Sequence, residues 1–529
     1  MVLEMSERRA IATGHEPGTG MVYLVGAGPG DPGLITVAGL EALHRADVVV
    51  FDRLAAPALL REVRDGALLI DAGKASGAHT LGQEAINALL VEHGRSGRTV
   101  VRLKGGDPFL FGRGGEEALA LREARVPFRI VPGVSSSLAA PAYAGIPVTH
   151  RGIAGSVLIA TGHEAAADTG ASFDWQAVAR GADTLVFLMG VERLATIAQQ
   201  LLAAGRPADQ PAALVRWGST PEQEVLIATL ATIANAARTK GVRPPATLIV
   251  GDVVALRERI AWFETLPLFG MRVLVTRTQE QASGLVERLR NLGAVPLEFP
   301  AISCKPVEEP SRLDAVVQQL PEHDWAVFTS RTGVEAVFAR FDALSKDARA
   351  FAATKVCAVG PATARSLADH GIRADLVPDG FSSADAAAAL AARGISGRRV
   401  LLLQADIAPP TFGEQLTAAG AMVTSVAAYR TVGAEGRRAE LERLLSDGLD
   451  AITFTSSSTV RHLLDTLGGD AGAIRAAYIA SIGPQTSATA RQAGLRVDVE
   501  APVHTIDGLV AALTAFAGRA VAKRSATGE

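Results

Sequence analysis

The stretch Val101-Arg-Leu-Lys-Gly-Gly-Asp-Pro-Phe-Leu-Phe-Gly-Arg-Gly-Gly-Glu-Glu117 joins a short apolar strand to a loop that is rich in glycine. Glycine occupies positions 105, 106, 112, 114 and 115 of this loop. Packing alone does not ask for so many glycines, whereas glycine lets the backbone approach a ligand closely or adopt a positive φ. Open α/β sheets bind ligands at the carboxyl ends of their strands. The stretch therefore predicts a ligand site on an α/β fold.

Strand-like apolar runs alternate with helical patterns along the chain on both sides of this loop. The clearest predicted strands cover residues 22–25, 47–51, 99–103, 156–160 and 184–188. This alternation indicates an α/β architecture with largely parallel sheets. A chain of 529 residues is too long for one ordinary core and corresponds to roughly three or four lobes.

Composition narrows the class of protein. A hydrophobic share of 48% with 20% charged residues is typical of a soluble globular chain. The net charge of −3 gives no global basic footprint, so nucleic acid is not an expected partner. No apolar run reaches the ~18 residues of a membrane span. Residues 1–20 predict a disordered leader without the apolar core of a signal peptide, and the cytoplasm is the expected location.

The chain has two cysteines, Cys304 and Cys357, each in an apolar, strand-like context. Both are expected to be small buried hydrophobes. The sequence contains no CxxC, no HExxH and no paired His/Cys spacing, so no metal cofactor is predicted.

A domain boundary is predicted near residues 264–271. It follows a helix-like stretch over residues 252–263 and precedes a new strand over residues 272–277. We therefore expect a first domain over residues 21–265, a second domain over residues 270–520 and a polar tail over residues 521–529.

The second half contains an internal echo. Ala326-Val-Phe-Thr-Ser330 is similar to Ile452-Thr-Phe-Thr-Ser456, and the Gly-Pro segment at 358–364 is similar to that at 481–487. Two copies in the same order predict two similar lobes. A cleft between two lobes is a common place for a ligand.

The turn Val22-Tyr-Leu-Val-Gly-Ala-Gly-Pro-Gly-Asp-Pro-Gly33 looks at first like a nucleotide-binding fingerprint. A G-x-G-x-x-G pattern starting at Gly26 needs glycine at position 31, where the chain has Asp31. Pro29 and Pro32 also remove two N–H donors that a phosphate cradle needs. The turn fits a ligand without phosphates, such as S-adenosylmethionine, because a sulfonium cation is better served by carbonyl oxygens than by a helix N-terminus.

The first half resembles the uroporphyrinogen-III C-methyltransferases of the tetrapyrrole methyltransferase group. The matching segments run in order through the whole half and are 25–32, 51–54, 73–74, 104–117, 131–136, 142–151, 161–163, 187–190 and 217–223. The resemblance implies a fold of two α/β lobes with S-adenosylmethionine in the cleft between them, and a homodimer formed through this half. It implies that the cofactor site is lined by Pro29, Gly105, Gly106, Asp107, Leu110, Ser135, Ser136, Met189, Gly218 and Ala246.

The implied reaction methylates two ring carbons of uroporphyrinogen III and yields precorrin-2, which feeds sirohaem or cobalamin. Asp52 follows a strand, so its side chain is expected to face the cleft and take a proton. Lys74 is the candidate to return a proton or hold a carboxylate. The substrate carries eight carboxylates, for which Arg53, Arg113 and Arg151 are candidate partners. For Ser135 and Ser136, helix capping is an equally good interpretation.

The second half resembles uroporphyrinogen-III synthase. The carrying segments are 275–277, 328–330, 359–363, 377–378 with 382–383, 400–403, 429–430, 454–456, 482–484 and 505–509. The resemblance implies two Rossmann-like lobes joined by a β-ladder formed by residues 300–306 and 426–432. Lobe one is expected over residues 270–303 and 431–520, and lobe two over residues 304–430. The implied reaction, which needs no cofactor, closes hydroxymethylbilane with inversion of its last ring.

Tyr429 lies at the predicted ladder and is the candidate acid for the leaving hydroxyl. A half-buried interface tyrosine is its other interpretation. Candidate substrate-binding hydroxyls at strand ends, each of which can equally be a cap, are Thr329, Ser330, Thr363, Thr455, Ser456 and Thr486.

The leading hypothesis is a bifunctional enzyme that performs two consecutive steps on tetrapyrroles. A methyltransferase of a later corrin intermediate is a second enzymatic interpretation. A third treats the second half as an inactive two-lobed module that binds tetrapyrrole. This third alternative rests on residues 404–410, where many relatives have a basic or glycine-rich stretch and this chain has Gln-Ala-Asp-Ile-Ala-Pro-Pro.

Overall fold

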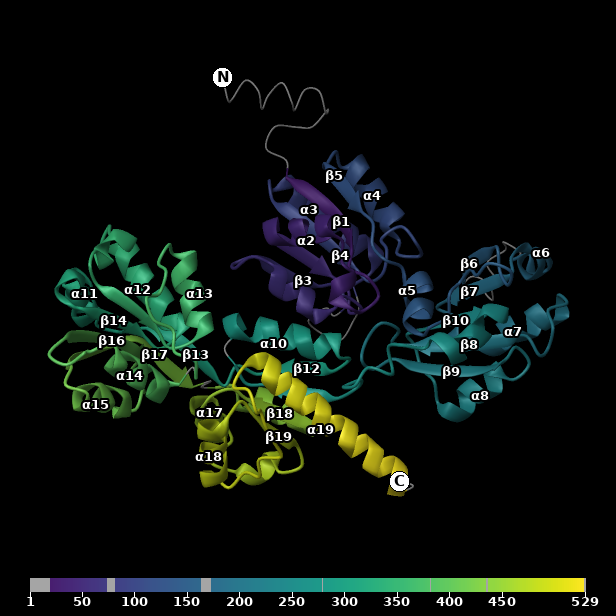
Figure 1. The fold of residues 1–529 in the computed structure, drawn as a ribbon. Coiled ribbons are helices and arrows are strands. Elements are labelled where there is room, and N and C mark those ends of the chain that lie inside the picture. The colour runs from purple at the N-terminus through teal and green to yellow at the C-terminus, as the bar shows by residue number, and fades with distance from the viewer. Residues whose placement is uncertain are drawn as a thin grey trace. The chain divides into compact units, whose positions relative to one another are not determined.

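The computed structural model describes residues 20–73, 81–162, 173–277, 279–380, 382–433 and 436–527. These residues form four five-stranded sheets, each flanked by helices (Figure 1). The chain divides into two compact units. The first comprises Met1–Gly270 with Leu292–Ala294, and the second comprises Met271–Asn291 with Val295–Glu529.

The first lobe of the first unit is a parallel sheet with helices on both faces. Its strand order is β3-β2-β4-β1-β5, and every pairing in it is parallel. One face packs against α3 and α4, and the other packs against α2 and a short 3-10 helix. The elements are β1 (Met21–Gly26), α2 (Val37–Arg45), β2 (Val48–Phe51), a 3-10 helix (Pro57–Glu62), β3 (Leu68–Asp71), α3 (Gln83–Arg95), β4 (Thr99–Lys104), α4 (Gly114–Glu123) and β5 (Phe128–Val131).

The second lobe differs from the expectation of largely parallel sheets. Its order is β6-β7-β10-β8-β9, and only β6 and β7 pair in parallel, whereas β10 pairs antiparallel with β7 and β8, and β8 with β9. The short connection between β8 and β9 allows an antiparallel pair, because a parallel pair needs a crossover of a dozen residues or more. The elements are α5 (Ser136–Tyr143), β6 (Val157–Thr161), α6 (Trp175–Gly181), β7 (Thr184–Leu188), α7 (Leu194–Ala203), β8 (Pro211–Arg216), β9 (Glu224–Thr229), α8 (Ile233–Lys240) and β10 (Ala246–Val250).

The helix expected over residues 252–263 is also shorter than its apolar pattern suggested. A 3-10 helix covers Asp252–Leu256, and α9 covers only Arg257–Ile260. Val253 and Val254 are buried against the core below β8 and β10, and Phe263 is buried as well. The apolar residues of this segment therefore pack a bent backbone against the core and do not form one continuous helix.

The second unit contains two Rossmann-like lobes. The first has the parallel order β12-β11-β18-β19-β20, which is the 2-1-3-4-5 order of doubly wound folds. The second has the order β13-β17-β16-β14-β15. The first lobe is built from β11 (Arg272–Val275), α10 (Gln279–Asn291), β12 (Val295–Glu298), α16 (Arg438–Ser446), β18 (Ala451–Phe454), α17 (Ser457–Thr466), β19 (Tyr478–Ser481), α18 (Pro484–Gln492), β20 (Val499–Glu500) and α19 (Ile506–Thr527).

The second lobe of this unit contributes the ladder. Its elements are β13 (Ile302–Pro306), α11 (Ser311–Gln318), β14 (Trp325–Phe328), α12 (Arg331–Ala343), β15 (Lys355–Ala358), α13 (Pro361–Asp369), α14 (Ser383–Ala392), β16 (Arg399–Ala405), α15 (Thr411–Ala418) and β17 (Met422–Gly433). β13 pairs antiparallel with the end of β17, from Ile302 opposite Gly433 to Pro306 opposite Tyr429. This is the predicted β-ladder, and the predicted fold class is confirmed for both halves.

The internal echo marks a βαβα unit that occurs once in each lobe. β14, α12, β15 and α13 form one copy, and β18, α17, β19 and α18 form the other. Without the ladder strand β13, the second lobe has the order β15-β14-β16-β17, which is the same 2-1-3-4 order as β12-β11-β18-β19 in the first lobe. The two lobes are therefore similar, and the repeat brings hydroxyl-bearing strand ends to both sheets.

Residues 521–527 differ from the expected polar tail because they continue helix α19 to Thr527. Alanine, lysine and arginine are strong helix formers, and the segment contains no proline. The leader expected over residues 1–20 lies outside the described residues except for Gly20. In the part of the chain that the structure describes, none of the helices has the length and apolar character needed to cross a membrane.

Candidate functional site

A cavity of about 500 Å³ in the first unit is lined by residues from both of its lobes. Its size lies in the range typical of pockets for small molecules and cofactors. The ten residues predicted for the cofactor site all line this cavity, namely Pro29, Gly105, Gly106, Asp107, Leu110, Ser135, Ser136, Met189, Gly218 and Ala246. The structure thus brings together residues that lie up to about two hundred positions apart in the chain. Pro29 and residues 105–107 follow the carboxyl ends of β1 and β4, where such sheets bind ligands.

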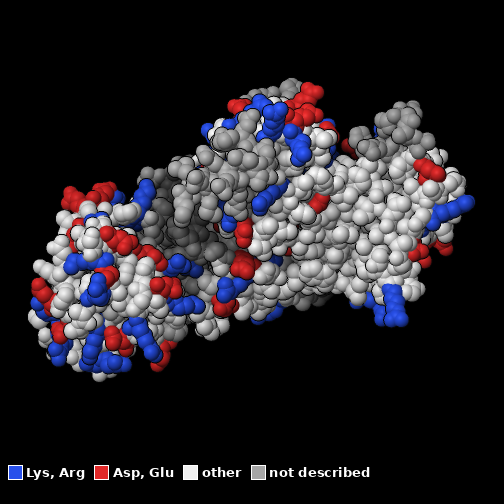
Figure 2. Space-filling model, turned by 90° about the horizontal axis from the view of Figure 1, so that it is seen from above, with Lys and Arg blue, Asp and Glu red and all other residues white. Residues whose placement is uncertain are grey.

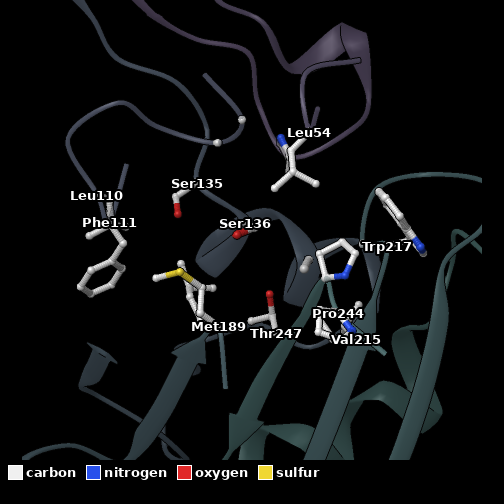
Figure 3. A pocket seen from close by; sticks show the side chains of 18 of the residues that line it. Leu54, Leu110, Phe111, Ser135, Ser136, Met189, Val215, Trp217, Pro244 and Thr247 are labelled. Atoms are coloured by element: carbon white, nitrogen blue, oxygen red, sulfur yellow. The ribbon is translucent and has the colours of Figure 1, made fainter. Parts of the chain in front are cut away.

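The cavity wall is mostly apolar and poor in backbone donors. Figure 3 shows Ser136, Met189 and Thr247 directed into the same space, with Leu54 approaching from the first lobe. Pro29, Pro244 and Pro245 belong to the wall and have no N–H to offer an anion. Leu54 and Met189, which both line the cavity, leave 44% and 53% of their surface exposed.

The glycine-rich stretch has more packing reasons than its sequence suggested. A Cβ on Gly105 would lie 2.8 Å from the Leu54 Cβ, and one on Gly112 or Gly114 would lie 2.8 or 2.3 Å from the Pro108 carbonyl oxygen. Gly106 is different, because it has φ +69° and its Cβ would meet nothing closer than 3.8 Å. The expectation that packing does not ask for these glycines is therefore wrong for three of them, and Gly106 is the one whose backbone lies open to the cavity.

Strained backbone gathers around the cavity. Phe111, Met189 and Trp217 line it and have positive φ angles of 55°, 53° and 49°. Arg113 and Ser219, which are close to them in the chain, are also left-handed. Such conformations cost about 1–3 kcal/mol each and persist only where the surroundings hold them, which is most often at functional sites.

Two predicted cofactor residues also have local structural roles. Ser135 caps helix α5, because its hydroxyl oxygen accepts hydrogen bonds from the Ser137 N–H at 3.2 Å and the Ser137 hydroxyl at 2.9 Å. The Asp107 carboxylate accepts from the Phe109 N–H at 2.8 Å and the Gly133 N–H at 3.0 Å. Asp107 therefore holds the glycine loop against the neighbouring strand end, and each of its oxygens retains one lone pair for a ligand.

A buried network of charges lies beside the cavity at the end of β4. Arg102 and Lys104 are 2% and 3% exposed, and Glu117 of α4 is fully buried. Glu117 Oε1 is 3.0 Å from Arg102 Nε and 2.8 Å from Lys104 Nζ. Burial lowers the pKa of Lys104 below its ordinary value, and the adjacent Arg102 charge adds to this. Glu117 Oε2 is buried without a hydrogen-bond partner among the described residues.

Asp52 belongs to this network rather than to the cavity wall. Its Oδ1 accepts from Arg102 Nη2 at 2.5 Å, and one third of its side chain is exposed. Asp52 is not among the described residues that line the cavity, whereas its neighbours Arg53 and Leu54 are. Asp52 thus does not line this cavity itself, because Arg102 binds its carboxylate beside the cavity, and its place in the substrate cleft stays a prediction.

The other predicted polar residues are dispersed. Arg53 lines the cavity. Arg113 makes a bidentate ion pair with Glu116 on the surface, at 2.8 and 2.7 Å, and Arg151 is exposed. Lys74 lies outside the described residues. The three candidate arginines are thus not gathered in one place by this structure, and only Arg53 belongs to the cavity.

Sequence reasoning missed Arg102, Lys104 and Glu117. A signal was present, because Arg102 interrupts the apolar run Val100, Val101 and Leu103 of a parallel strand. Such strands are buried on both faces, and a charged residue inside one is retained only with a partner. The pattern could not say where that partner lies, since Glu117 is one of two adjacent glutamates.

In the second unit, the predicted hydroxyls follow the strands that the echo marks. Ser330 caps α12 by accepting from the Gly333 N–H at 3.1 Å, and Ser456 caps α17 by accepting from the Thr459 N–H at 3.4 Å. Thr329 and Thr455 precede these caps and are half-buried. Thr363 and Thr486 are buried in the first turns of α13 and α18. Capping is therefore a structural role that Ser330 and Ser456 have with or without a substrate.

Tyr429 lies at the end of the ladder and is half-buried. The Ser330 hydroxyl donates to its phenol oxygen at 3.1 Å, and the same Ser330 oxygen accepts from Gly333. Burial raises the pKa of Tyr429 above its ordinary value, partly opposed by the bond from Ser330. The phenol thus stays protonated, and the directed chain from Gly333 through Ser330 leaves its hydrogen free to point elsewhere.

Charges of both signs are mixed on one lobe of the second unit. On the face in Figure 2, Lys and Arg alternate with Asp and Glu over the lobe built from α11 to α15. Within the described residues, no group of three or more His, Cys, Asp or Glu side chains is arranged to hold a metal ion.

The first half of the chain has two lobes around a glycine-walled cavity, and the second half has two Rossmann-like lobes joined by a ladder. The chain is thus a fused α/β protein whose two halves are built separately. A family model described as Tetrapyrrole (Corrin/Porphyrin) Methylases matches residues 21–234, and one described as Uroporphyrinogen-III synthase HemD matches residues 283–511. The chain belongs to the family that joins a tetrapyrrole methylase domain to a uroporphyrinogen-III synthase domain, and it is a bifunctional protein of tetrapyrrole biosynthesis.

Individual relatives cover the chain to different extents. The Porphyrin biosynthesis protein HemD of Ruminiclostridium josui is 38% identical over 501 residues, which cover 94% of this chain and 98% of that protein. The Uroporphyrinogen-III C-methyltransferase of Bacillus subtilis (strain 168) is 42% identical over 317 residues, 60% of this chain and 64% of that protein. A solved uroporphyrin-III-C-methyltransferase from Thermus thermophilus is 40% identical, covers 46% of this chain and 97% of its own, and has a TM-score of 0.39.

Proposed function

We propose that this chain cyclises hydroxymethylbilane to uroporphyrinogen III with its second half and methylates that product twice with its first half, giving precorrin-2. The observation that carries the proposal is the cavity of the first unit, whose wall contains all ten residues expected around S-adenosylmethionine. The product of the synthase reaction is the substrate of the methyltransferase reaction. Fusion of the two domains therefore joins consecutive steps.

The residues of the cavity suit S-adenosylmethionine chemically. When bound, this molecule supplies a methyl group on a positively charged sulfur. A wall with prolines at 29, 244 and 245 favours a cation over a phosphate, because it lacks the N–H donors that an anion needs. The exposed Met189 side chain provides a soft apolar surface for an adenine ring. Gly106 lets the backbone approach the ligand without a side chain between them.

Transfer of a methyl cation from the sulfonium to a substituted ring carbon adds a positive charge to the substrate and releases a neutral thioether, so a proton must leave the substrate from another of its atoms. Asp52 is our candidate to accept it, and Arg102 holds that carboxylate at the end of β2. Arg53 in the cavity wall is the candidate partner for a substrate carboxylate. Lys74 remains our candidate to return a proton or hold a carboxylate, and Arg113 and Arg151 remain proposed partners for substrate carboxylates. Positioning of the ring carbon supplies much of the acceleration.

In the second half, Tyr429 is our candidate to protonate the departing hydroxyl of hydroxymethylbilane. Its support is the directed hydrogen-bond chain from Gly333 through Ser330 to the phenol oxygen. Hydroxyls of Thr329, Ser330, Thr363, Thr455, Ser456 and Thr486 are the proposed binding groups. The proposal includes homodimerisation through the first half and a cytoplasmic location, and sedimentation of the purified chain tests the dimer.

The test incubates the whole protein with hydroxymethylbilane and S-adenosylmethionine and follows the absorbance of precorrin-2. Asp52→Ala is expected to lose methylation by about 10²-fold or more while uroporphyrinogen III still forms. Equal loss of both activities would count against separate sites. If the synthase half is only a binding module, hydroxymethylbilane closes spontaneously to uroporphyrinogen I, and the first step of the proposal is wrong.

A further inference from the structure

Asp31 connects segments that lie far apart in the first unit. Its backbone N–H donates to the Ser219 hydroxyl at 3.2 Å, across 188 positions of sequence. One carboxylate oxygen accepts from the Tyr143 phenol at 2.6 Å, and the other accepts from the Gly33 N–H at 2.8 Å. Asp31 therefore joins the glycine turn of the first lobe to the end of α5 and to the loop between β8 and β9.

These contacts close into a ring of hydrogen bonds. The Ser219 N–H donates to Gln223 Oε1 at 3.0 Å, and Gln223 Nε2 donates to the Tyr143 carbonyl at 3.2 Å. Ser219 and Gln223 are 2% and 4% exposed. We call the set Asp31, Tyr143, Ser219 and Gln223 the latch. Each member touches two others, so removal of one bond loosens the attachment of both loops.

The latch stands directly behind two walls of the cavity. Pro29 lies two positions before Asp31, and Gly218 lies one position before Ser219, and both line the cavity. Members of the latch are not among its lining residues. A Cβ on Gly30 would lie 2.4 Å from the Thr220 side chain, so the two loops are already in close contact. The latch can act on a bound molecule only by fixing where these walls stand.

The loop between β8 and β9 needs such a support. Trp217 and Ser219 have positive φ angles of 49° and 72°, which non-glycine residues rarely adopt without external constraint. Without the hydrogen bonds that Ser219 makes with Asp31 and Gln223, this loop is expected to relax towards ordinary backbone conformations, and Gly218 would move with it.

The Tyr143 bond is suited to a permanent connection. Burial, with the bond to Asp31, raises the pKa of the Tyr143 phenol, so it remains a donor across the physiological range. The ring packs against Trp262 and Phe263, with centroids 5.1 and 4.9 Å away. These contacts fix the ring while its hydroxyl reaches Asp31.

We propose that the latch is a positioning device that sets the affinity of the cavity for its nucleoside sulfonium cofactor without touching it. This inference rests on the proposed function of the cavity. A cavity wall that is already fixed before binding does not have to be ordered by the ligand. Pre-organisation of the wall therefore raises the affinity for the ligand. Asp31 is therefore a positioning residue. In the glycine turn it binds the opposite lobe through Ser219 and Tyr143, and it does not contact the ligand.

The experiment measures binding of S-adenosylhomocysteine to the full chain by isothermal titration calorimetry. Tyr143→Phe and Asp31→Ala each remove the bond between the phenol and the carboxylate, and each is expected to raise the Kd about tenfold. The double variant is expected to bind only about as weakly as the worse single variant, because the two residues share one bond. Tyr23→Phe is the matched control, since Tyr23 packs in the first lobe outside the latch, and its Kd should equal that of the parent.

The binding stoichiometry separates positioning from general damage. A misfolded fraction lowers the number of sites per chain at unchanged Kd, whereas a loosened latch raises the Kd at unchanged stoichiometry. The latch is wrong if both latch variants bind with the parent's Kd, or if their effects on Kd add in the double variant. Failure of the parent itself to bind S-adenosylhomocysteine would overturn the proposed function and the latch together.

Discussion

The two halves of this protein build their candidate sites from different materials. In the first half, the cavity is shaped largely by glycines, prolines and strained backbone, and a buried network of charges lies beside it. In the second half, the candidate residues are hydroxyls at the starts of helices, two of which are also caps. A site made of backbone conformation leaves a specific sequence pattern, whereas a site made of serine and threonine caps looks like ordinary structure.

The difference extends to how the candidate proton-transfer groups are supported. Asp52 is held by a buried guanidinium that is itself neutralised by Glu117. Tyr429 is supported by an uncharged chain of hydrogen bonds. A buried ion network is costly when one partner is lost, while a neutral hydroxyl chain costs little to shorten. Substitutions in the first half should therefore affect stability and chemistry together, and those in the second half should separate the two.

The largest expected effect tests the buried network. Glu117→Gln leaves Lys104 buried without its ion-pair partner and Arg102 with Asp52 alone, which should lower the stability of the first lobe by about 3–5 kcal/mol. Hydrogen exchange read by peptide mass should rise over β4 and α4 and stay unchanged over β14 and α12. Glu116→Gln is the matched control on the same helix, because its partner Arg113 is on the surface, and it should leave exchange unaltered. Equal protection in both variants would contradict the network's role.

The next effect tests whether the second half separates chemistry from stability. Tyr429→Phe should lower the rate of ring closure by about 10²-fold or more, since a positioned acid contributes at least that much. Methylation of supplied uroporphyrinogen III should not change. Tyr478→Phe removes a hydroxyl from the other lobe of the same unit, where the ring packs edge-on against Phe516, and should keep full activity. If Tyr429→Phe closed the ring at the parent's rate, Tyr429 would be an interface residue and not the acid.

How far the sequence predicts each half follows from the same contrast. The ten cavity residues were predicted from the resemblance of the first half to the uroporphyrinogen-III C-methyltransferases, whose motifs occur in order along the chain. Tyr429 was placed at the ladder from the resemblance of the second half to uroporphyrinogen-III synthase. The antiparallel pairing of β8, β9 and β10 was not foreseen, because alternation of strands and helices does not reveal strand direction where connections are short.

The direction of individual side chains was harder to predict. Asp52 follows a strand, but the sequence pattern did not reveal that Arg102 of the neighbouring strand β4 binds its carboxylate. The partner of a buried charge is a tertiary property, and local pattern does not contain it. The glycines at 112 and 114 likewise avoid a collision with Pro108 that only the folded loop reveals.

A third prediction therefore compares two glycines. Gly218→Ala places a Cβ 2.4 Å from that of Ala140, and overpacking of this kind costs about 1–3 kcal/mol. If the strain moves the cavity wall, the Kd for S-adenosylhomocysteine should rise by about 10- to 100-fold. Gly115→Ala is the control from the glycine-rich stretch, since its Cβ meets nothing within 4 Å, and its Kd should not change. If Gly115→Ala raised the Kd more than Gly218→Ala, the glycine-rich stretch and not the opposite lobe would shape the cavity.

The smallest effect separates capping from binding in the second half. Ser456→Asp keeps an N-cap of equal quality, so α17 should be as stable as in the parent, whereas Ser456→Ala should lose about 1 kcal/mol. If Ser456 contacts a carboxylate of hydroxymethylbilane, the aspartate repels it and the KM should rise about tenfold, as about 1.4 kcal/mol would give. The alanine variant should raise the KM less than the aspartate does, despite its lower stability. An aspartate variant with the parent's KM would make Ser456 a cap alone, and the substrate would then have to be held by groups that the helix does not need.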